Sequence, residues 1–200
     1  MKNSFFTRRE LMHLLGTGTI GSLISLTTSP AYSLPNDGAK PIYVSKGNGD
    51  KVPVGGNAMT LKLSKMQTGG CLSFFENTLA PGFMGAPPHF HQTFDEICYV
   101  LEGTVHVLVG EEVFELNAGD VHLRPRGIMH TFWNSGTQSA RCLELSVPGG
   151  HEAYLKDISA LLSKPVPPNA RDFAEFEKKY DIVYQMDKLP EIMQKYHVHL

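Results

Sequence analysis

Two stretches of sequence decide the fold: "PPHFHQTFDEICYVLEG" at residues 87–103 and "GDVHLRPRGIMHTFWN" at residues 119–134. Both contain short apolar runs bounded by Gly, Pro or Asn, which is typical of short antiparallel strands. Residues two apart on a strand point to the same side, so His89 and His91 project together. The pair can therefore bind one common partner.

Two further metal-binding side chains lie in the same stretches. Glu96 opens the strand that follows the histidine pair, and His130 comes after a Pro-x-Gly turn that reverses the chain. Three imidazoles and one carboxylate suit a borderline divalent ion such as manganese, iron, nickel or copper, with bonds near ~2.1 Å. We expect one such ion, and Glu96 is the ligand best suited to accept a proton as catalytic base. The predicted metal ligands are His89, His91, Glu96 and His130.

The residues of a substrate pocket follow from strand parity. If Glu96 points inward, Cys98 and Val100 also point inward, because they lie two and four positions later on the same strand. Phe132, two positions after His130, points inward for the same reason. One of the adjacent phenylalanines 74 and 75 supplies a further wall. These side chains give a mostly apolar lumen, which suits an organic ligand that chelates the metal through oxygen. The predicted pocket residues are Phe75, Cys98, Val100 and Phe132.

Strand signals continue on both sides of the two stretches. Short alternating segments run from Ala58 to Gly150, and their spacing predicts an all-β antiparallel sandwich or barrel. The spacing of apolar residues becomes helical after Gly150, with Asn169 placed to cap a helix. We expect two short helices that cover an outer face of the sheet, followed by a last short helix or arm.

The two motifs resemble those of the cupin superfamily, His-x-His-x3/4-Glu-x6-Gly and Gly-x5-Pro-x-Gly-x2-His-x3-Asn. The four predicted ligands occupy the ligand positions of these motifs, and Phe83 replaces the leading glycine of the first one. The resemblance implies an antiparallel jelly-roll β-barrel with short C-terminal helices, and it also implies a homodimer. The structural positions that match are Gly103, Gly119, Pro125, Gly127 and Asn134.

A finer resemblance suggests an activity. The segments "TGGCLSFFENTLAPG" and "FAEFEKKYDIVY" look like those of quercetin-dioxygenase-like single-domain cupins. This implies oxygenolytic cleavage of an aromatic enol or diketone, with the glutamate as base. One alternative is a manganese-type decarboxylase or an isomerase, which would need a lumen cation such as Arg124 or Arg126. A third reading is a non-enzymatic cupin that binds a metal or a small ligand.

The other histidines are expected outside this site. His106 and His122 lie in alternating strands, in surface or core positions, and His151 lies in a helix-entry turn that we expect at the surface. His197 and His199 repeat the His-x-His spacing, but no acid or third histidine accompanies them. They therefore make a poor second metal site.

The first 33 residues are predicted to be an export signal. Arg8 and Arg9 resemble a twin-arginine signal, residues 14–30 carry no charge, and Ala31-Tyr32-Ser33 has the small-x-small cleavage pattern. A plain secretory signal or an uncleaved anchor is the alternative. The prediction is therefore a periplasmic or extracellular protein. The expected segments are the signal at 1–33, an extended arm at 34–56, the cupin barrel at 57–150 and a helical extension at 151–200.

The composition limits the kinds of partner that this protein is expected to bind. The net charge of −2 provides no basic patch for nucleic acid, and no DNA-binding helical segment accompanies the strands. After the signal, no uncharged apolar run is long enough to span a membrane. The three cysteines are odd in number and lack CxxC spacing, so they form no disulfide framework. The expected partner is a small-molecule substrate.

Overall fold

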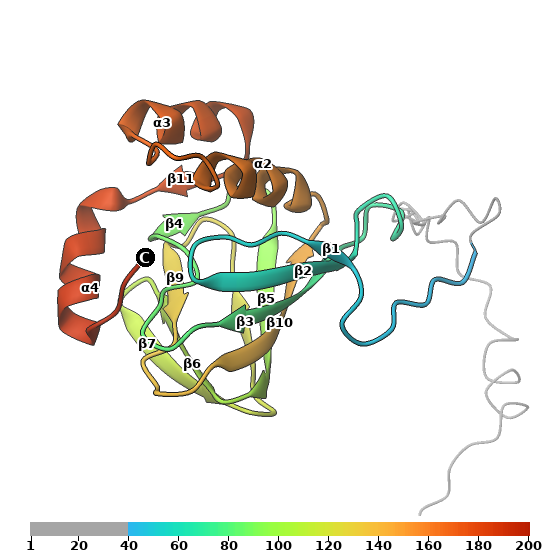
Figure 1. Cartoon of the computed structure of the whole chain (residues 1–200), viewed down its shortest axis with the longest axis horizontal. Coiled ribbons are helices and arrows are strands. Elements are labelled where there is room, and N and C mark those ends of the chain that lie inside the picture. Colours follow the sequence, from blue (N-terminus) through green and yellow to red (C-terminus); the bar gives the residue numbers. More distant parts are fainter. Residues whose placement is uncertain (1–39) are drawn as a thin grey trace, which may run out of the picture. The chain divides into compact units, whose positions relative to one another are not determined.

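The computed structural model describes residues 40–200, so the predicted export signal lies outside the described residues. Figure 1 shows strands gathered into two sheets, with the helices of the C-terminal part packed around them. No helix within residues 40–200 combines the length and the apolar character that a membrane crossing requires.

All strands pair antiparallel, in two sheets. In spatial order, the first sheet consists of β1 (Asp50–Lys51), β2 (Asn57–Leu63), β3 (Ser73–Leu79), β10 (Ala140–Val147), β5 (Asp95–Glu102) and β8 (Val121–Arg124). The second consists of β11 (Val183–Tyr184), β4 (His89–Phe90), β9 (His130–Trp133), β6 (Thr104–Val109) and β7 (Glu112–Asn117). Strands distant in sequence lie side by side, as in a jelly roll. The predicted all-β jelly-roll fold with short C-terminal helices is confirmed.

The main core lies between the two sheets. Buried and half-buried residues alternate strictly along β3 and β10, as expected when one face of each strand is covered. Burial of each large apolar side chain contributes about 1.5–3 kcal/mol, so this cluster holds the sheets together. Its members come from both sheets: Leu79, Cys98, Val100, Val105, Val107, Leu116, Phe132, Ala140 and Cys142.

Helix α2 (Glu152–Leu162) does not cover an outer sheet face. Its residue Ile158 shares a hydrophobic cluster with Met59 and Phe75, whose side chains face the space between the sheets. Helix α3 (Ala170–Lys179) adds partly buried aromatic side chains to the same cluster. The expectation of an outer-face position is therefore wrong, because the two helices close one open end between the sheets (Figure 1).

Helix α3 begins where the sequence predicts. The Asn169 side chain accepts hydrogen bonds from the backbone nitrogens of Arg171 and Asp172, and the Asp172 carboxylate accepts one from the Asn169 nitrogen. This reciprocal pair is a capping box, which satisfies backbone donors that the first helical turn leaves free.

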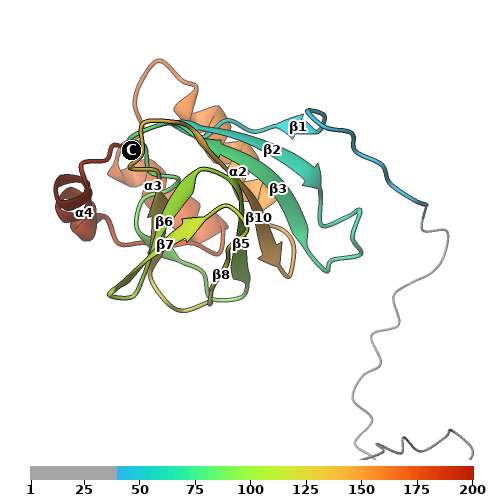
Figure 2. The same ribbon diagram turned by 90° about the horizontal axis from the view of Figure 1, so that it is seen from below.

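The last helix covers a different side of the sheets. The chain passes from β11 through a short 3-10 helix (Met186–Lys188) into α4 (Leu189–Tyr196). Ile192 packs in one cluster with Trp133 of β9, which alternates with the inward-facing Phe132. Helix α4 therefore covers the outer face of the second sheet, away from α2 in both views (Figures 1 and 2).

Candidate metal centre

The four predicted ligands meet at one point between the sheets. His89 on β4 lies opposite His130 on β9 in the strand register, His91 follows β4 directly, and Glu96 is the second residue of β5. One donor atom from each of the four residues lies within 4.8 Å of the others. Pairing of β4 with β9 therefore brings together residues that lie far apart in sequence.

Each histidine has one ring nitrogen bound to a backbone carbonyl. The Nδ1 atoms of His89, His91 and His130 lie 2.8, 2.5 and 3.0 Å from the carbonyl oxygens of Pro87, Asp181 and Ile128. Because a carbonyl oxygen only accepts, Nδ1 is the protonated nitrogen and Nε2 keeps its lone pair. These bonds fix both the tautomer and the ring orientation that a metal ligand needs.

The free Nε2 atoms face the Glu96 carboxylate. His130 Nε2 lies 3.0 Å from Glu96 Oε2, and His91 Nε2 lies 3.6 Å from Glu96 Oε1. Both nitrogens are buried, and neither makes a hydrogen bond of normal geometry. Buried polar atoms without a partner are unfavourable unless a ligand satisfies them. This donor set therefore fits a divalent cation.

The charge state of the cluster also fits a cation. Burial and the neighbouring His130 and His91 hold the pKa of His89 well below its ordinary value, so this ring is neutral. Burial alone would raise the pKa of Glu96, but the Arg124 guanidinium and the adjacent histidines hold it well below its ordinary value. Neutral imidazole and ionised carboxylate are the forms that bind metals. The same low pKa makes Glu96 a weak base.

A cavity of about 310 Å³ adjoins the cluster. His89 and Glu96 lie in its wall, which is otherwise mostly apolar. Of the predicted pocket residues, Phe75 and Phe132 line it, whereas Cys98 and Val100 lie fully buried in the core between the sheets. The difference arises because Glu96 lies near the start of β5, and the following inward positions point into the packed core.

The comparison with known families rests on the segment that carries all four residues. Residues 75–147 match the family model of the cupin domain. This segment is similar to cupin domains. The four clustered residues lie inside the matched segment, whereas helices α2, α3 and α4 lie beyond it.

One curated relative and several solved structures are similar to parts of this chain. Germin-like protein subfamily T member 2 of Arabidopsis thaliana is 35% identical over 107 residues, which are 50% of this chain and 47% of the relative. The chain therefore spans about half the length of the curated relative it matches.

The solved structures resemble parts of the chain at TM-scores near 0.4. KdgF from Halomonas sp. is 22% identical over 49% of this chain and 85% of its own, with a TM-score of 0.44. A predicted oxalate decarboxylase from Thermotoga maritima is 26% identical over 46% and 80%, also at 0.44. A sugar phosphate isomerase of the cupin superfamily from Silicibacter pomeroyi is 22% identical over 46% and 59%, at 0.41. Likeness at this level carries no information about activity.

His151, which lies just beyond the matched segment, belongs to the cavity wall. The expectation that it lies at the surface is wrong, since its side chain is only 11% exposed. Its Nε2 lies 3.9 Å from Glu96 Oε1, and its ring centre lies 5.0 Å from that of His91. Burial lowers the pKa of His151 to about 3, so the ring is neutral. Its position depends on how the chain turns after β10, which local sequence does not specify.

A buried ion pair behind Glu96 was not predicted. Arg124 lies opposite Glu96 in the register of β5 and β8, and its guanidinium binds Glu144 of β10. Arg124 Nη1 also lies 3.5 Å from Glu96 Oε2, so one cation contacts two carboxylates. Burial raises the pKa of Glu144 despite this pairing. The signal in the sequence was an acid at an inward position of the alternating segment "ARCLELSV".

A second group of donor atoms in the described part of the chain suits a cation poorly. Cys98, Cys142 and Glu144 bring their donor atoms within 4.8 Å of one another. Arg124 already binds Glu144, and the hydrogen bond with Cys98 together with burial raises the pKa of Cys142 well above its ordinary value. A protonated thiol beside a fixed positive charge does not attract a metal ion. We therefore assign this cluster to the core.

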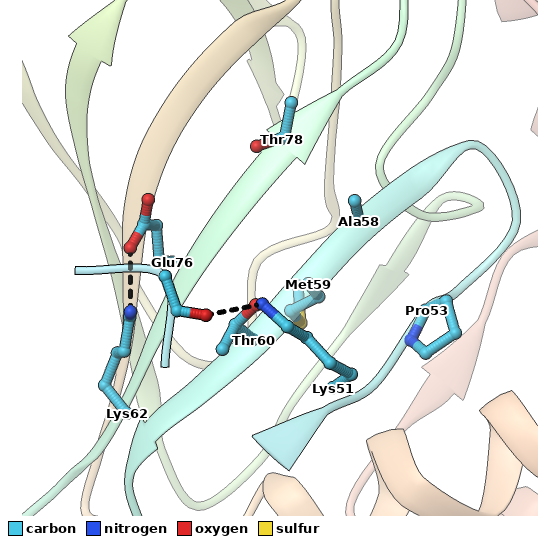
Figure 3. A pocket seen from close by; sticks show the side chains of 9 residues that line it. Lys51, Pro53, Ala58, Met59, Thr60, Lys62, Glu76 and Thr78 are labelled. Carbon is cyan, nitrogen blue, oxygen red and sulfur yellow. Dashed lines mark hydrogen bonds and ion pairs between the residues drawn. The ribbon is translucent and has the colours of Figure 1, made fainter. Parts of the chain in front are cut away.

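Another pocket, on the outer side of β2 and β3, lies away from the histidines. Figure 3 shows its charged side chains paired with their neighbours. Lys62 Nζ lies 3.0 Å from Glu76 Oε2, and Lys51 Nζ donates to Thr60 Oγ1 at 3.1 Å. Because these groups already satisfy one another, this pocket offers no equivalent of the metal-ligand cluster.

Proposed function

We propose that this protein is a metal-dependent cupin that binds one divalent transition metal through His89, His91, Glu96 and His130. The observation that carries the proposal is the pair of buried Nε2 atoms without hydrogen-bond partners, which face an ionised carboxylate. Manganese, iron, nickel and copper all suit this mixture of nitrogen and oxygen donors. When bound, such an ion supplies Lewis-acid stabilisation of negative charge on a ligand oxygen.

We further propose a dioxygenase-like reaction on a small organic substrate that chelates through oxygen. The apolar wall of the cavity, which includes Met59, Phe75, Phe132 and Ile158, supports a substrate with an apolar body. These side chains would exclude water and orient the oxygen end of the substrate toward Glu96. We assign Glu96 the role of proton acceptor. Because its pKa is low, Glu96 would accept a proton more readily from an acidic group, such as an enolic hydroxyl, than from a weakly acidic group.

The alternative decarboxylase or isomerase acting on a small acid has weaker support. Arg124 is already paired with Glu96 and Glu144. Arg126 is largely exposed and forms a two-point ion pair with Asp95, with contacts of 2.9 and 2.8 Å. Neither of these candidate cations is therefore free to bind a second carboxylate in the cavity. A small dianion would also gain little from the apolar wall.

The proposed metal site is tested by metal analysis. We would measure the metal content of protein recovered from its native compartment, beside His89→Ala and the control His106→Ala. His106 stacks on Trp133, away from the cluster. One equivalent of manganese, iron, nickel or copper, lost in His89→Ala and kept in His106→Ala, is the expected result. No metal in the parent protein would overturn the proposal.

The reaction class needs a separate measurement. Oxygen uptake would be followed with enolic aromatic compounds and, in parallel, carbon dioxide release with small dicarboxylic acids. We expect uptake with the aromatic compounds that is absent in Glu96→Gln. Carbon dioxide release without oxygen uptake would replace the dioxygenase with the decarboxylase.

We also propose that the protein is exported to the periplasm or beyond, on the basis of its N-terminal sequence alone. Cell fractionation of the parent protein and of Arg8→Lys/Arg9→Lys would test this. Retention of the double variant in the cytoplasm is expected for a twin-arginine signal. Equal export of both proteins would contradict that assignment.

A further inference from the structure

A segment near the C-terminal end lies along β4, the strand that carries His89 and is directly followed by His91. Val183 pairs with Phe90 and Tyr184 with His89, so β11 extends the second sheet beyond β4. The Gln185 nitrogen donates to the Pro88 carbonyl at 2.8 Å. Since β4 has only two residues, this added strand supplies much of the backbone hydrogen bonding that holds it.

Asp181, at the start of this segment, binds His91 directly. Its backbone oxygen accepts the Nδ1 proton of His91 at 2.5 Å, although Asp181 comes 90 positions later in the chain. His89 and His130 use carbonyls only two positions away for the same purpose. His91 is therefore the ligand whose tautomer depends on the tertiary fold.

The Asp181 carboxylate binds the loop that follows His91. Oδ1 accepts from the Gln92 nitrogen at 2.8 Å, and Oδ2 accepts from the Thr93 nitrogen at 2.7 Å and from Thr93 Oγ1 at 2.5 Å. These hydrogen bonds hold the loop and Asp181 together. The backbone carbonyl of Asp181 is therefore held against the His91 ring. Hydrogen bonds to a charged group are stronger than those between neutral groups.

We propose that Asp181 is a positioning residue of the metal centre, which fixes the ring of His91 and the loop that carries it. This inference rests on the metal site of the proposed function and adds a residue outside the segment that matches the cupin family model. The C-terminal segment is then part of the site and not only a cover. Loss of a group that orients a metal ligand typically lowers metal affinity about 10- to 100-fold.

The experiment is a Co²⁺ titration of the metal-free full-length protein, followed by visible absorption and by competition with a chelator. The variants are Asp181→Ala and the milder Asp181→Asn, which keeps one acceptor oxygen but replaces the other with a donor. Asp187→Asn is the matched control, since Asp187 is an exposed acid of the same segment. Thermal unfolding of each metal-free variant reports folding separately from metal binding.

We expect Asp181→Asn to bind Co²⁺ about tenfold more weakly and Asp181→Ala up to about 100-fold more weakly, with an altered absorption spectrum. Asp187→Asn should behave like the parent. Parent affinity and an unchanged spectrum in both Asp181 variants would overturn the positioning role, even if their unfolding temperatures fell. If Asp181→Ala does not fold, Asp181→Asn decides the question. A parent protein that binds no Co²⁺ would overturn the metal site itself.

Discussion

At the scale of single residues, the site combines ligands with charges buried behind them. Glu96 contacts two histidines on one side and Arg124 on the other, and Arg124 in turn binds Glu144. Removal of one partner from a buried ion pair leaves the other charge without compensation. Glu144 is not a predicted ligand, but through Arg124 it affects the electrostatic environment of the predicted ligand Glu96.

Glu144→Gln is expected to destabilise the protein strongly. The variant removes the nearer of the two carboxylates that contact Arg124 and leaves only the 3.5 Å contact with Glu96. Breaking a buried ion pair completely typically costs about 3–5 kcal/mol, so we expect a loss of up to about 3 kcal/mol here. The free energy of unfolding from urea denaturation measures the effect. Glu111→Gln, which changes an exposed acid, is the control and should lie within about 0.5 kcal/mol of the parent. A Glu144→Gln variant as stable as the parent would show that the pair contributes nothing.

The buried histidines predict acid sensitivity of the metal-free protein. The pKa of His151 is about 3 in the folded state, below its ordinary value of about 6.5, so the unfolded state binds more protons between these values. Stability should therefore fall as the pH drops from about 6.5, by up to about 3 kcal/mol at pH 4 for this group. Urea denaturation across this range would show a shallower fall in His151→Gln. An identical pH dependence in both proteins would rule out a contribution from His151.

At the scale of elements, the capping box of α3 is the clearest local signal that the structure confirms. This helix places Phe173 and Phe176 against the cluster that closes the end between the sheets. Its start is set by Asn169 and Asp172, which lie three positions apart and need no distant partner. The helix boundary could therefore be predicted, whereas the face it covers could not.

Asn169→Ala should lower the free energy of unfolding by about 1 kcal/mol, because two backbone donors of α3 lose their acceptor. Asn169→Asp keeps an acceptor at the same position and should be close to neutral. Thermal unfolding of the two variants gives the comparison. Equal losses in both would mean that the side-chain cap does not stabilise α3.

At the scale of the whole molecule, the proposed metal links both sheets, since β4 and β9 belong to one and β5 to the other. A ligand that binds only the folded state stabilises it by mass action. The C-terminal extension contributes to the same region through His151 and Asp181. The homodimer implied by the family resemblance stays a prediction, which the mass of the protein in solution would test.

Addition of Mn²⁺ or Co²⁺ to the metal-free protein should raise its unfolding temperature. At a free metal concentration 100 times the dissociation constant, the stabilisation is about 2.7 kcal/mol. Differential scanning calorimetry with and without metal measures it, and excess chelator should reverse it. His89→Ala should show no shift, whereas His106→Ala should respond like the parent. A similar shift in His89→Ala would place the bound metal elsewhere.

The sequence by itself determined the jelly-roll class, the convergence of His89, His91, Glu96 and His130, and the cap at Asn169. The cap and the all-β antiparallel class follow from local patterns of strand periodicity and turn residues, whereas the jelly-roll class and the set of four ligands were also supported by the resemblance of the two motifs to those of cupins. Only the tertiary structure decided the roles of His151 and Asp181, the pairing of Arg124 with Glu144, and the end covered by α2. Each of these depends on contacts between segments distant in the chain, which the packing of the two sheets and the helices creates and no local pattern encodes.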